Sequence, residues 1–254
     1  MHLWRAWLRA SDVHLAHLRA QLNAEELGRV DRFIFPEHRR RFLIARVALR
    51  GILARYVGRA PGELGFETAP GGKPYLAANH VGTDMVDKMG TQNFPRESIV
   101  SPFYPPLYPG DIQFNMTHSA DLMLLAVTVR RELGVDVEQV RDRVACDRLA
   151  KRYFAPDEVE ELNSLPEGER RAAFFRCWTR KEAYIKAVGK GLALPLRSFF
   201  VPVRPGATML ITSAEEPGGI AAWTLRNLEP AKGFVGALVA DGPVTALRCY
   251  EWTE

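Results

Sequence analysis

The stretch Phe174–Leu192, FFRCWTRKEAYIKAVGKGL, decides how the rest of this 254-residue chain is interpreted. Its spacing predicts a helix that ends at the glycine-lysine-glycine turn of residues 189–191. In that helix Trp178, Glu182 and Lys186 lie on one face. Glu and Lys are rarely fully buried unless they are paired or bind a ligand. The face therefore indicates either an ordinary surface Glu–Lys pair or part of a binding site, and spacing alone favours neither.

Composition limits the possible classes of protein. With 47% hydrophobic residues, the chain can bury the core of one large domain or of two subdomains. The net charge of +4 suits an anionic ligand or an acidic partner, but it is too small to indicate nucleic-acid binding. The three cysteines are far apart, without the spacing of a zinc site or a disulfide framework, which predicts a reduced, cytoplasmic setting. No apolar run is long enough for a membrane span, so we expect none.

Three regular elements are predicted near the N-terminus. Apolar and polar residues alternate over residues 2–8, which predicts a strand, and residues 23–33 are expected to form a short helix capped by Asn23. From Pro36 to Gly58, apolar residues recur at helical spacing and arginines occupy the other faces.

Three of these arginines, Arg39, Arg46 and Arg50, fall on one narrow stripe of the predicted helix. An arginine-rich face is usually solvated. The alternative is a phosphate clamp, because guanidinium groups match phosphate geometry.

A turn and a long loop follow. The GKPYL sequence contains Lys73 and Pro74, and this turn can offer backbone and ammonium groups to an anion, although such turns are common. Residues 77–113 have no sustained period and include the proline-rich run SPFYPPLYPG. This segment predicts either a loosely packed surface loop or a functional lid.

Polar residues then appear on predicted strands. Residues 112–116 alternate as a strand that ends in Thr117-His118-Ser119, and residues 122–130 form a buried strand. In the next strand, GVDVE, Asp136 and Glu138 share one face. Neighbouring carboxylates repel one another unless a cation lies between them, and Mg²⁺ would fill that role. The alternative is a solvent-facing acidic strand.

The remaining pattern predicts helices and an antiparallel sheet. Helices are expected at residues 141–154 and 156–165, before the long helix. Strands are expected at residues 198–203, 209–212, 220–228 and 233–240. This mixture predicts an α+β fold.

Taken together and in this order, the arginine-rich helix, GKPYL, FNMTHS, GVDVE and WTRKEAYIKAVGKGL resemble the 4′-phosphopantetheinyl transferase superfamily, in its long, surfactin-synthetase-activating form. The resemblance covers the chain apart from the loop of residues 77–113. It implies a monomeric pseudo-dimer of two similar α/β halves, each a small, mostly antiparallel sheet packed with helices, with the active site between them. The halves would be residues 1–125, with coenzyme A-binding motifs, and 126–254, with metal-binding and catalytic motifs.

The resemblance also implies a reaction. A Mg²⁺-dependent enzyme would transfer 4′-phosphopantetheine from coenzyme A to a serine of an apo acyl or peptidyl carrier protein, releasing adenosine 3′,5′-bisphosphate. Fatty-acid, polyketide and nonribosomal-peptide carriers are not distinguished by the sequence. No nucleic-acid or membrane partner is expected.

Site residues follow from the matched motifs. Asp136, Glu138 and Glu182 would hold Mg²⁺, Glu182 would accept the serine proton directly or through a metal-bound water, and Lys186 would contact the diphosphate. The residues implied to bind coenzyme A are Arg29 and Arg41 at the 3′-phosphate, Thr117, His118 and Lys186 at the phosphates, and Lys73 and Pro74 at the adenine. Thr117 stands where the family usually has serine, which keeps the hydroxyl group.

Two other classes of function are compatible with these motifs. One is a non-catalytic protein of the same fold that binds coenzyme A or a nucleotide, and the other is a metal-dependent phosphohydrolase. The retained set of Asp136, Glu138, Glu182 and Lys186 argues against the first, because a binding protein has no need for mutually repelling carboxylates. Product analysis separates the second, since hydrolysis would release phosphopantetheine without a carrier.

Overall fold

A computed structural model describes residues 1–77, 107–206, 208–211 and 223–253, so most of the predicted loop of residues 77–113 lies outside the described residues. The chain divides into two compact units, which are described separately. The larger unit comprises residues 1–7, 69–73 and 113–254, and the smaller unit comprises residues 8–68 and 74–112.

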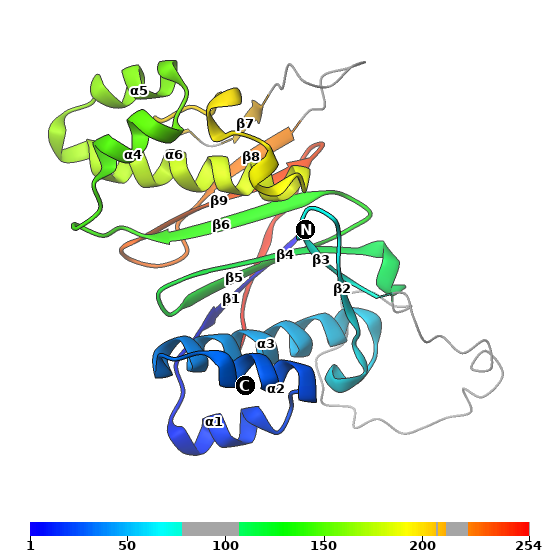
Figure 1. Cartoon of the computed structure of the whole chain (residues 1–254). Coiled ribbons are helices and arrows are strands. Elements are labelled where there is room, and N and C mark those ends of the chain that lie inside the picture. The colour runs from blue at the N-terminus through cyan, green and yellow to red at the C-terminus, as the bar shows by residue number, and fades with distance from the viewer. Residues whose placement is uncertain (78–106, 207, 212–222, 254) are drawn as a thin grey trace. The chain divides into compact units, whose positions relative to one another are not determined.

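The described residues form helices and strands in an α+β arrangement, as the sequence predicted (Figure 1). The helices are α1 (Asp12–Arg19), α2 (Ala24–Arg32), α3 (Pro36–Val57), α4 (Cys146–Tyr153), α5 (Pro156–Asn163) and α6 (Glu167–Val188). The strands are β1 (His2–Trp7), β2 (Phe66–Thr68), β3 (Pro74–Leu76), β4 (Ile112–Ser119), β5 (Leu122–Val129), β6 (Leu133–Gln139), β7 (Thr208–Ile211), β8 (Trp223–Leu228), β9 (Phe234–Asp241) and β10 (Arg248–Glu251).

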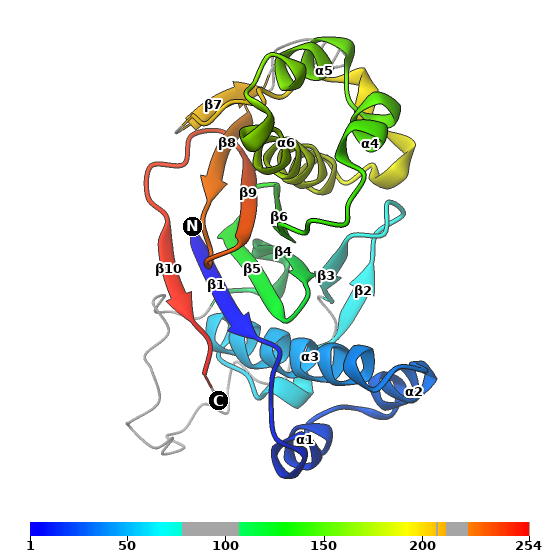
Figure 2. The same cartoon turned by 90° about the vertical axis from the view of Figure 1, so that its left-hand side faces the viewer.

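In its described residues, the larger unit contains two four-stranded sheets, with strand orders β10-β1-β5-β4 and β6-β9-β8-β7. The pairs in the second sheet are antiparallel, and β1 pairs antiparallel with β5 but parallel with β10. Buried apolar residues of β1 and β5 pack against those of β6 and β9, so the two sheets share one core. Helix α6 covers the other side of β6 and β9, where a second apolar core forms (Figure 2).

Helix α6 lies unusually close to β6, and a glycine makes this possible. A Cβ atom at Gly134 would lie 2.1 Å from the carbonyl oxygen of Ala183 and 2.4 Å from the amide nitrogen of Ala187. Any larger residue would therefore push the strand and the helix apart. The helix ends at Gly189, whose φ of 73° is left-handed, which confirms the predicted stop.

The smaller unit contains α1, α2, α3 and the paired strands β2 and β3. The predicted cap of α2 is confirmed, because the Asn23 side chain accepts from the Glu26 amide. The Glu26 carboxylate also accepts hydrogen bonds from Arg46 and Arg50, with its oxygens 2.7 and 2.9 Å from their guanidinium nitrogens. Arg50 is buried, so the stripe is neither a fully solvated face nor an open phosphate clamp. Instead, two of its arginines fasten α3 to α2.

Other sequence predictions need correction. The helix expected at residues 141–154 begins only at Cys146. Residues 198–203, expected to be a strand, form none, because the amides of Val201 and Val203 donate to the carboxylates of Glu158 and Glu161.

Four elements were not predicted, namely α1, β2, β3 and β10. Helix α1 has a single buried residue, Leu18, so its apolar signal is weak. Strand β10 has four residues, all exposed or half-buried, and it lies at the edge of its sheet.

Candidate functional site

Three elements of the larger unit meet at a cluster of polar side chains. From α6, the Lys186 Nζ lies 2.6 Å from Oδ1 of Asp136 on β6. From β4, the Thr117 hydroxyl donates to the same oxygen at 3.1 Å. Lys186 also lies 3.3 Å from the Thr117 hydroxyl. The structure therefore brings together three of the residues that the sequence singled out.

Asp136 is buried but incompletely satisfied. Asp136 is 5% exposed, and its Oδ2 is buried without a hydrogen-bond partner in the part of the chain that the structure describes. Burial raises the pKa of Asp136, Lys186 lowers it, and the neighbouring Glu138 carboxylate raises it further. An ionised carboxylate with one bare buried oxygen is costly, so a further cation or hydrogen-bond donor at Oδ2 would stabilise Asp136.

Glu182 lies one helical turn before Lys186 and is half-buried. Burial raises the pKa of Glu182, the negative charge of Asp136 raises it further, and Lys186 opposes both. The lysine forms its ion pair with Asp136, so the motif is more than a surface Glu–Lys pair along the helix. The Asp136 carboxylate is thus close enough to both Glu138 and Glu182 for like charges to repel.

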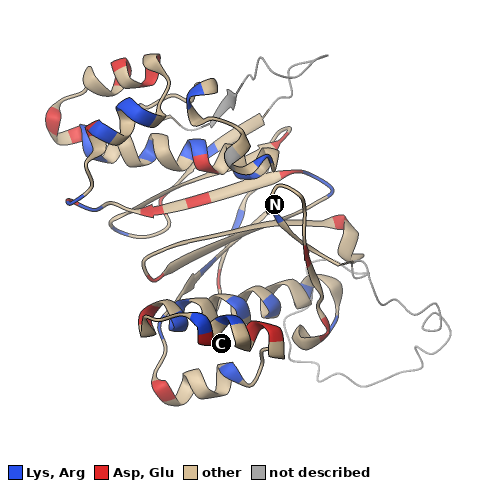
Figure 3. Cartoon of the chain, viewed as in Figure 1, with Lys and Arg blue, Asp and Glu red and all other residues tan. Residues whose placement is uncertain are grey.

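These carboxylates fit a divalent cation in their chemistry, although they do not form a finished cage. Among the described residues, no three His, Cys, Asp or Glu side chains converge closely enough to hold a metal ion. The bare Oδ2 of Asp136 and the two neighbouring carboxylates nevertheless provide the hard oxygen donors that Mg²⁺ prefers. Figure 3 shows acidic residues on the ribbon of β6 and both signs of charge along α6.

The sequence analysis gave no role to two further residues of β4. The Ser119 hydroxyl donates to Glu138 Oε2 at 2.7 Å, and the Asn115 side chain accepts from the Val135 amide at 2.9 Å. Both alternate with Thr117 along FNMTHS. Alternation along a strand puts all three on one face, and this signal could have identified them.

His118 and Lys73 occupy different surroundings. His118 is exposed, and as the neighbour of buried Thr117 on a strand it points to the other face of β4. The Lys73 ammonium pairs with Glu132 at 2.7 Å and donates to the Leu133 carbonyl at 3.0 Å, at the start of β6. The proposed contacts of His118 and Lys73 with coenzyme A stay predictions.

The turn before Lys73 packs against the end of α6. A Cβ atom at Gly71 would lie 1.7 Å from the Gly189 carbonyl oxygen, so a side chain at this position could not be accommodated. The contact fixes the turn that carries Lys73 relative to the helix that carries Lys186.

The remaining predicted residues belong to the smaller unit. Arg29 on α2 is exposed, with its guanidinium carbon 5.2 Å from the centre of the Phe42 ring. Arg41 on α3 is half-buried, and Pro74 begins β3. Their assignment to the 3′-phosphate and the adenine stays a prediction.

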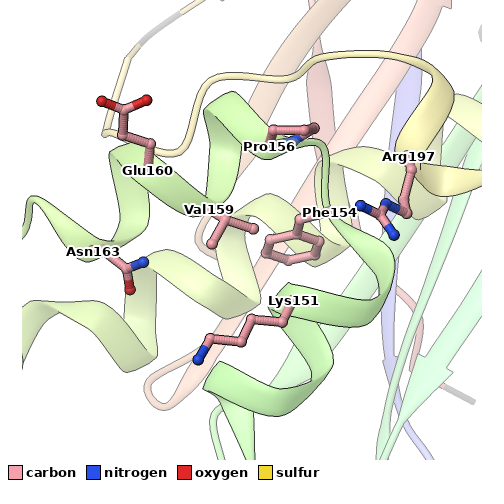
Figure 4. Close-up of a pocket in the computed structure, with 7 residues that line it drawn as sticks. All are labelled: Lys151, Phe154, Pro156, Val159, Glu160, Asn163 and Arg197. Atoms are coloured by element: carbon pink, nitrogen blue, oxygen red, sulfur yellow. The ribbon is translucent and has the colours of Figure 1, made fainter.

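A separate pocket of about 450 Å³ lies between α4, α5 and the segment after α6 (Figure 4). Phe154, Val159 and Pro156 give it an apolar lining, and Lys151 and Arg197 bring two cations to it. The lining contains none of the predicted site residues. Its chemistry therefore differs from that of the carboxylate cluster on β6 and α6.

Two family models match the chain. Residues 132–239 match the 4′-phosphopantetheinyl transferase superfamily, and residues 5–130 match the N-terminal region of 4′-phosphopantetheinyl transferases. The two matched regions fit a fold built of two halves. The described part of the chain contains no helix with the length and apolar character of a membrane span.

Similar proteins with curated descriptions include three bacterial transferases. The 4′-phosphopantetheinyl transferase HetI of Nostoc sp. (strain PCC 7120) is 36% identical over 242 residues, which cover 95% of this chain and 88% of HetI. A 4′-phosphopantetheinyl transferase of Bacillus subtilis is 27% identical, with 89% of this chain and 85% of that protein covered. Sfp of Bacillus subtilis (strain 168) is 25% identical, with 87% and 83% covered.

Proposed function

This chain belongs to the 4′-phosphopantetheinyl transferase superfamily, and we propose that it transfers 4′-phosphopantetheine from coenzyme A to a serine of an apo acyl or peptidyl carrier protein. The reaction would require Mg²⁺ and release adenosine 3′,5′-bisphosphate. The similarity to HetI over 95% of this chain supports an enzyme of this class.

One observation in the structure carries the proposal. Asp136 is buried against Lys186, keeps one oxygen without a hydrogen bond among the described residues, and lies within electrostatic reach of two other carboxylates. Such an arrangement lowers stability unless a ligand compensates for it. A Mg²⁺ ion together with the coenzyme A diphosphate would supply both the positive charge and the partner for Lys186.

Asp136, Glu138 and Glu182 would hold the ion. When bound, Mg²⁺ would neutralise the diphosphate and the charge that develops on the leaving group. The ion pair between Lys186 and Asp136 describes the protein without these ligands.

Glu182 is the proposed base for the carrier serine. Glu182 is half-buried on α6, one turn before Lys186, and its carboxylate would accept the serine proton directly or through a metal-bound water. The serine oxygen would attack the β-phosphorus of coenzyme A, its proton would pass to Glu182, and the bond from that phosphorus to the departing nucleotide phosphate would break.

Lys186 would stabilise the transferring phosphoryl group. Its side chain is 28% exposed, so the ammonium can turn from Asp136 to a bound phosphate without crossing a packed core. Arg29, Arg41, Lys73, Pro74, Thr117 and His118 are the residues proposed to hold the rest of coenzyme A.

The partner would be an acidic carrier domain, which suits the net charge of +4 on this chain. We also propose a cytoplasmic monomer that uses neither nucleic acid nor a membrane.

Intact-protein mass spectrometry tests the reaction. An apo carrier protein is incubated with this protein, coenzyme A and Mg²⁺, and a parallel sample contains EDTA. The expected result is a metal-dependent mass gain of one phosphopantetheine group on the carrier. No gain across several classes of carrier, with coenzyme A still bound, would favour a binding protein, and free phosphopantetheine without a carrier would indicate a hydrolase.

A further inference from the structure

Strands β4 and β6 belong to different sheets, yet side chains connect them at regular intervals. Asn115, Thr117 and Ser119 alternate along β4 and share the face that meets β6. They bond, in the same order, to the Val135 amide, to the Asp136 carboxylate and to the Glu138 carboxylate. Each carboxylate of the GVDVE motif therefore has its own hydroxyl partner on β4.

The hydroxyl of Ser119 is held in one direction. Ser119 is 7% exposed, and its oxygen accepts a hydrogen bond from the Gln139 amide at 3.1 Å. Because that amide occupies one side of the oxygen, the hydroxyl proton is directed to Glu138 Oε2, only 2.7 Å away. A short bond to an ionised acceptor is among the stronger hydrogen bonds in proteins.

The ion pair of Glu138 with Arg141 is much weaker than its bond with Ser119. Arg141 lies 3.6 Å from the same oxygen, but its side chain is 58% exposed. An exposed pair at this distance contributes little and does not fix an orientation. Ser119 is thus the group that fixes the Glu138 carboxylate in its half-buried position, with that side chain 24% exposed.

We propose that Ser119 is a positioning residue that orients Glu138 for binding of the divalent cation. The proposal rests on the proposed function, in which Asp136, Glu138 and Glu182 hold Mg²⁺. Groups that orient metal ligands from outside typically change metal affinity or activity by about 10- to 100-fold. Because Ser119 contacts Glu138 and has no role in the proposed proton transfer, it acts on metal affinity and not on the chemical step.

The test measures metal binding directly on the full-length protein. Electron paramagnetic resonance of free Mn²⁺ gives the dissociation constant in the presence of coenzyme A, for the wild type, Ser119→Ala and Glu138→Gln. Ser198→Ala is the matched control, because that exposed hydroxyl donates only to the Pro195 carbonyl. We expect Ser119→Ala to raise the Mn²⁺ dissociation constant roughly tenfold and Ser198→Ala to leave it unchanged.

Kinetics separates positioning from a general loss of structure. Excess Mg²⁺ should restore kcat in Ser119→Ala while the KM for Mg²⁺ stays raised, whereas partial unfolding would lower kcat at every metal concentration. Because the alanine also leaves the Gln139 amide without its acceptor, Ser119→Cys provides a variant of similar size with a weaker donor. It should shift the dissociation constant in the same direction.

The outcomes distinguish the two levels of the proposal. If Glu138→Gln weakens Mn²⁺ binding and both Ser119 variants bind Mn²⁺ like the wild type, the role of Ser119 is wrong and the metal site stands. If Glu138→Gln also binds normally, the metal assignment itself is wrong.

Discussion

Helix α6 carries two lysines that form ion pairs of the same length in opposite surroundings. Lys181 lies 2.6 Å from Glu158 of α5, and Lys186 lies 2.6 Å from Asp136 of β6. The side chains of the first pair are completely buried, whereas Lys186 in the second pair is 28% exposed. Distance alone would treat the two pairs as equivalent.

Hydrogen bonding separates them. Glu158 accepts from the amides of Ala155 and Val201, and Lys181 also donates to two backbone carbonyls. By contrast, Asp136 keeps a buried oxygen with no partner among the described residues. A buried pair with every group satisfied joins structural elements, whereas an unsatisfied pair beside further carboxylates fits the ligand site that we propose.

We expect the largest loss of stability when the fully buried pair of Lys181 and Glu158 is broken. Lys181→Met would leave Glu158 buried without its cation and should lower the free energy of unfolding by roughly 3–5 kcal/mol. Urea unfolding followed by circular dichroism measures this loss. Lys190→Met is the control, since Lys190 is exposed just after the same helix. Equal stability of the two variants would contradict a structural role for Lys181.

Asp136→Asn should show the opposite behaviour. The amide keeps the shape of the side chain but removes a buried negative charge near Glu138, so stability should change by about 1 kcal/mol or less. Transfer to the carrier should fall by about 100-fold or more, because a proposed metal ligand is lost. The mass-spectrometric assay gives the rate, with Asp241→Asn at the exposed end of β9 as control. A variant that unfolds as readily as Lys181→Met would place Asp136 among the structural pairs.

Gly134→Ala tests whether the pair of Lys186 and Asp136 depends on the close approach of α6 to β6. The added methyl group would collide with the Ala183 carbonyl oxygen and the Ala187 amide, so we expect a loss of roughly 1–3 kcal/mol. Displacing α6 from β6 should also lower transfer about tenfold, because Glu182 and Lys186 would move together. Gly168→Ala is the matched control for urea unfolding and transfer, because a Cβ atom there, in the first turn of α6, would meet no other part of the described structure within 4 Å beyond its own helix turn. Normal transfer in Gly134→Ala would show that the close approach is unnecessary.

The contrast between these pairs also explains what the sequence could predict. Periodicity indicated α6 and its glycine stop, because both depend on residues close together in the chain. It also placed Asp136 and Glu138 on one face of a strand. Partners across elements were inaccessible by this reasoning: nothing in the spacing joins Lys181 to Glu158 or Ser119 to Glu138.

The errors have the same origin. Arg46 and Arg50 lie on the predicted stripe, but both guanidinium groups donate hydrogen bonds to Glu26 of another helix. Val201 and Val203 alternate as in a strand, yet side-chain carboxylates bind their amides in place of a neighbouring strand. The spacing of residues predicts the face of a helix or strand on which a side chain lies, but its partner depends on how the elements pack together.

The smallest expected effect extends the comparison to an exposed ion pair. Arg5 of β1 lies 2.9 Å from Glu251 of β10, and their side chains are 36% and 45% exposed. Since water solvates both ions and Arg5 also donates to the Pro230 carbonyl, Glu251→Gln should lower the free energy of unfolding by only about 0.2–1 kcal/mol.

Urea unfolding at low salt and at about 1 M NaCl distinguishes the two kinds of pair, because salt screens exposed charges and leaves buried ones largely unscreened. The loss in Glu251→Gln should vanish at high salt while that in Lys181→Met persists. A loss in Glu251→Gln as large as that in Lys181→Met would mean that burial and full hydrogen bonding do not set the strength of these pairs.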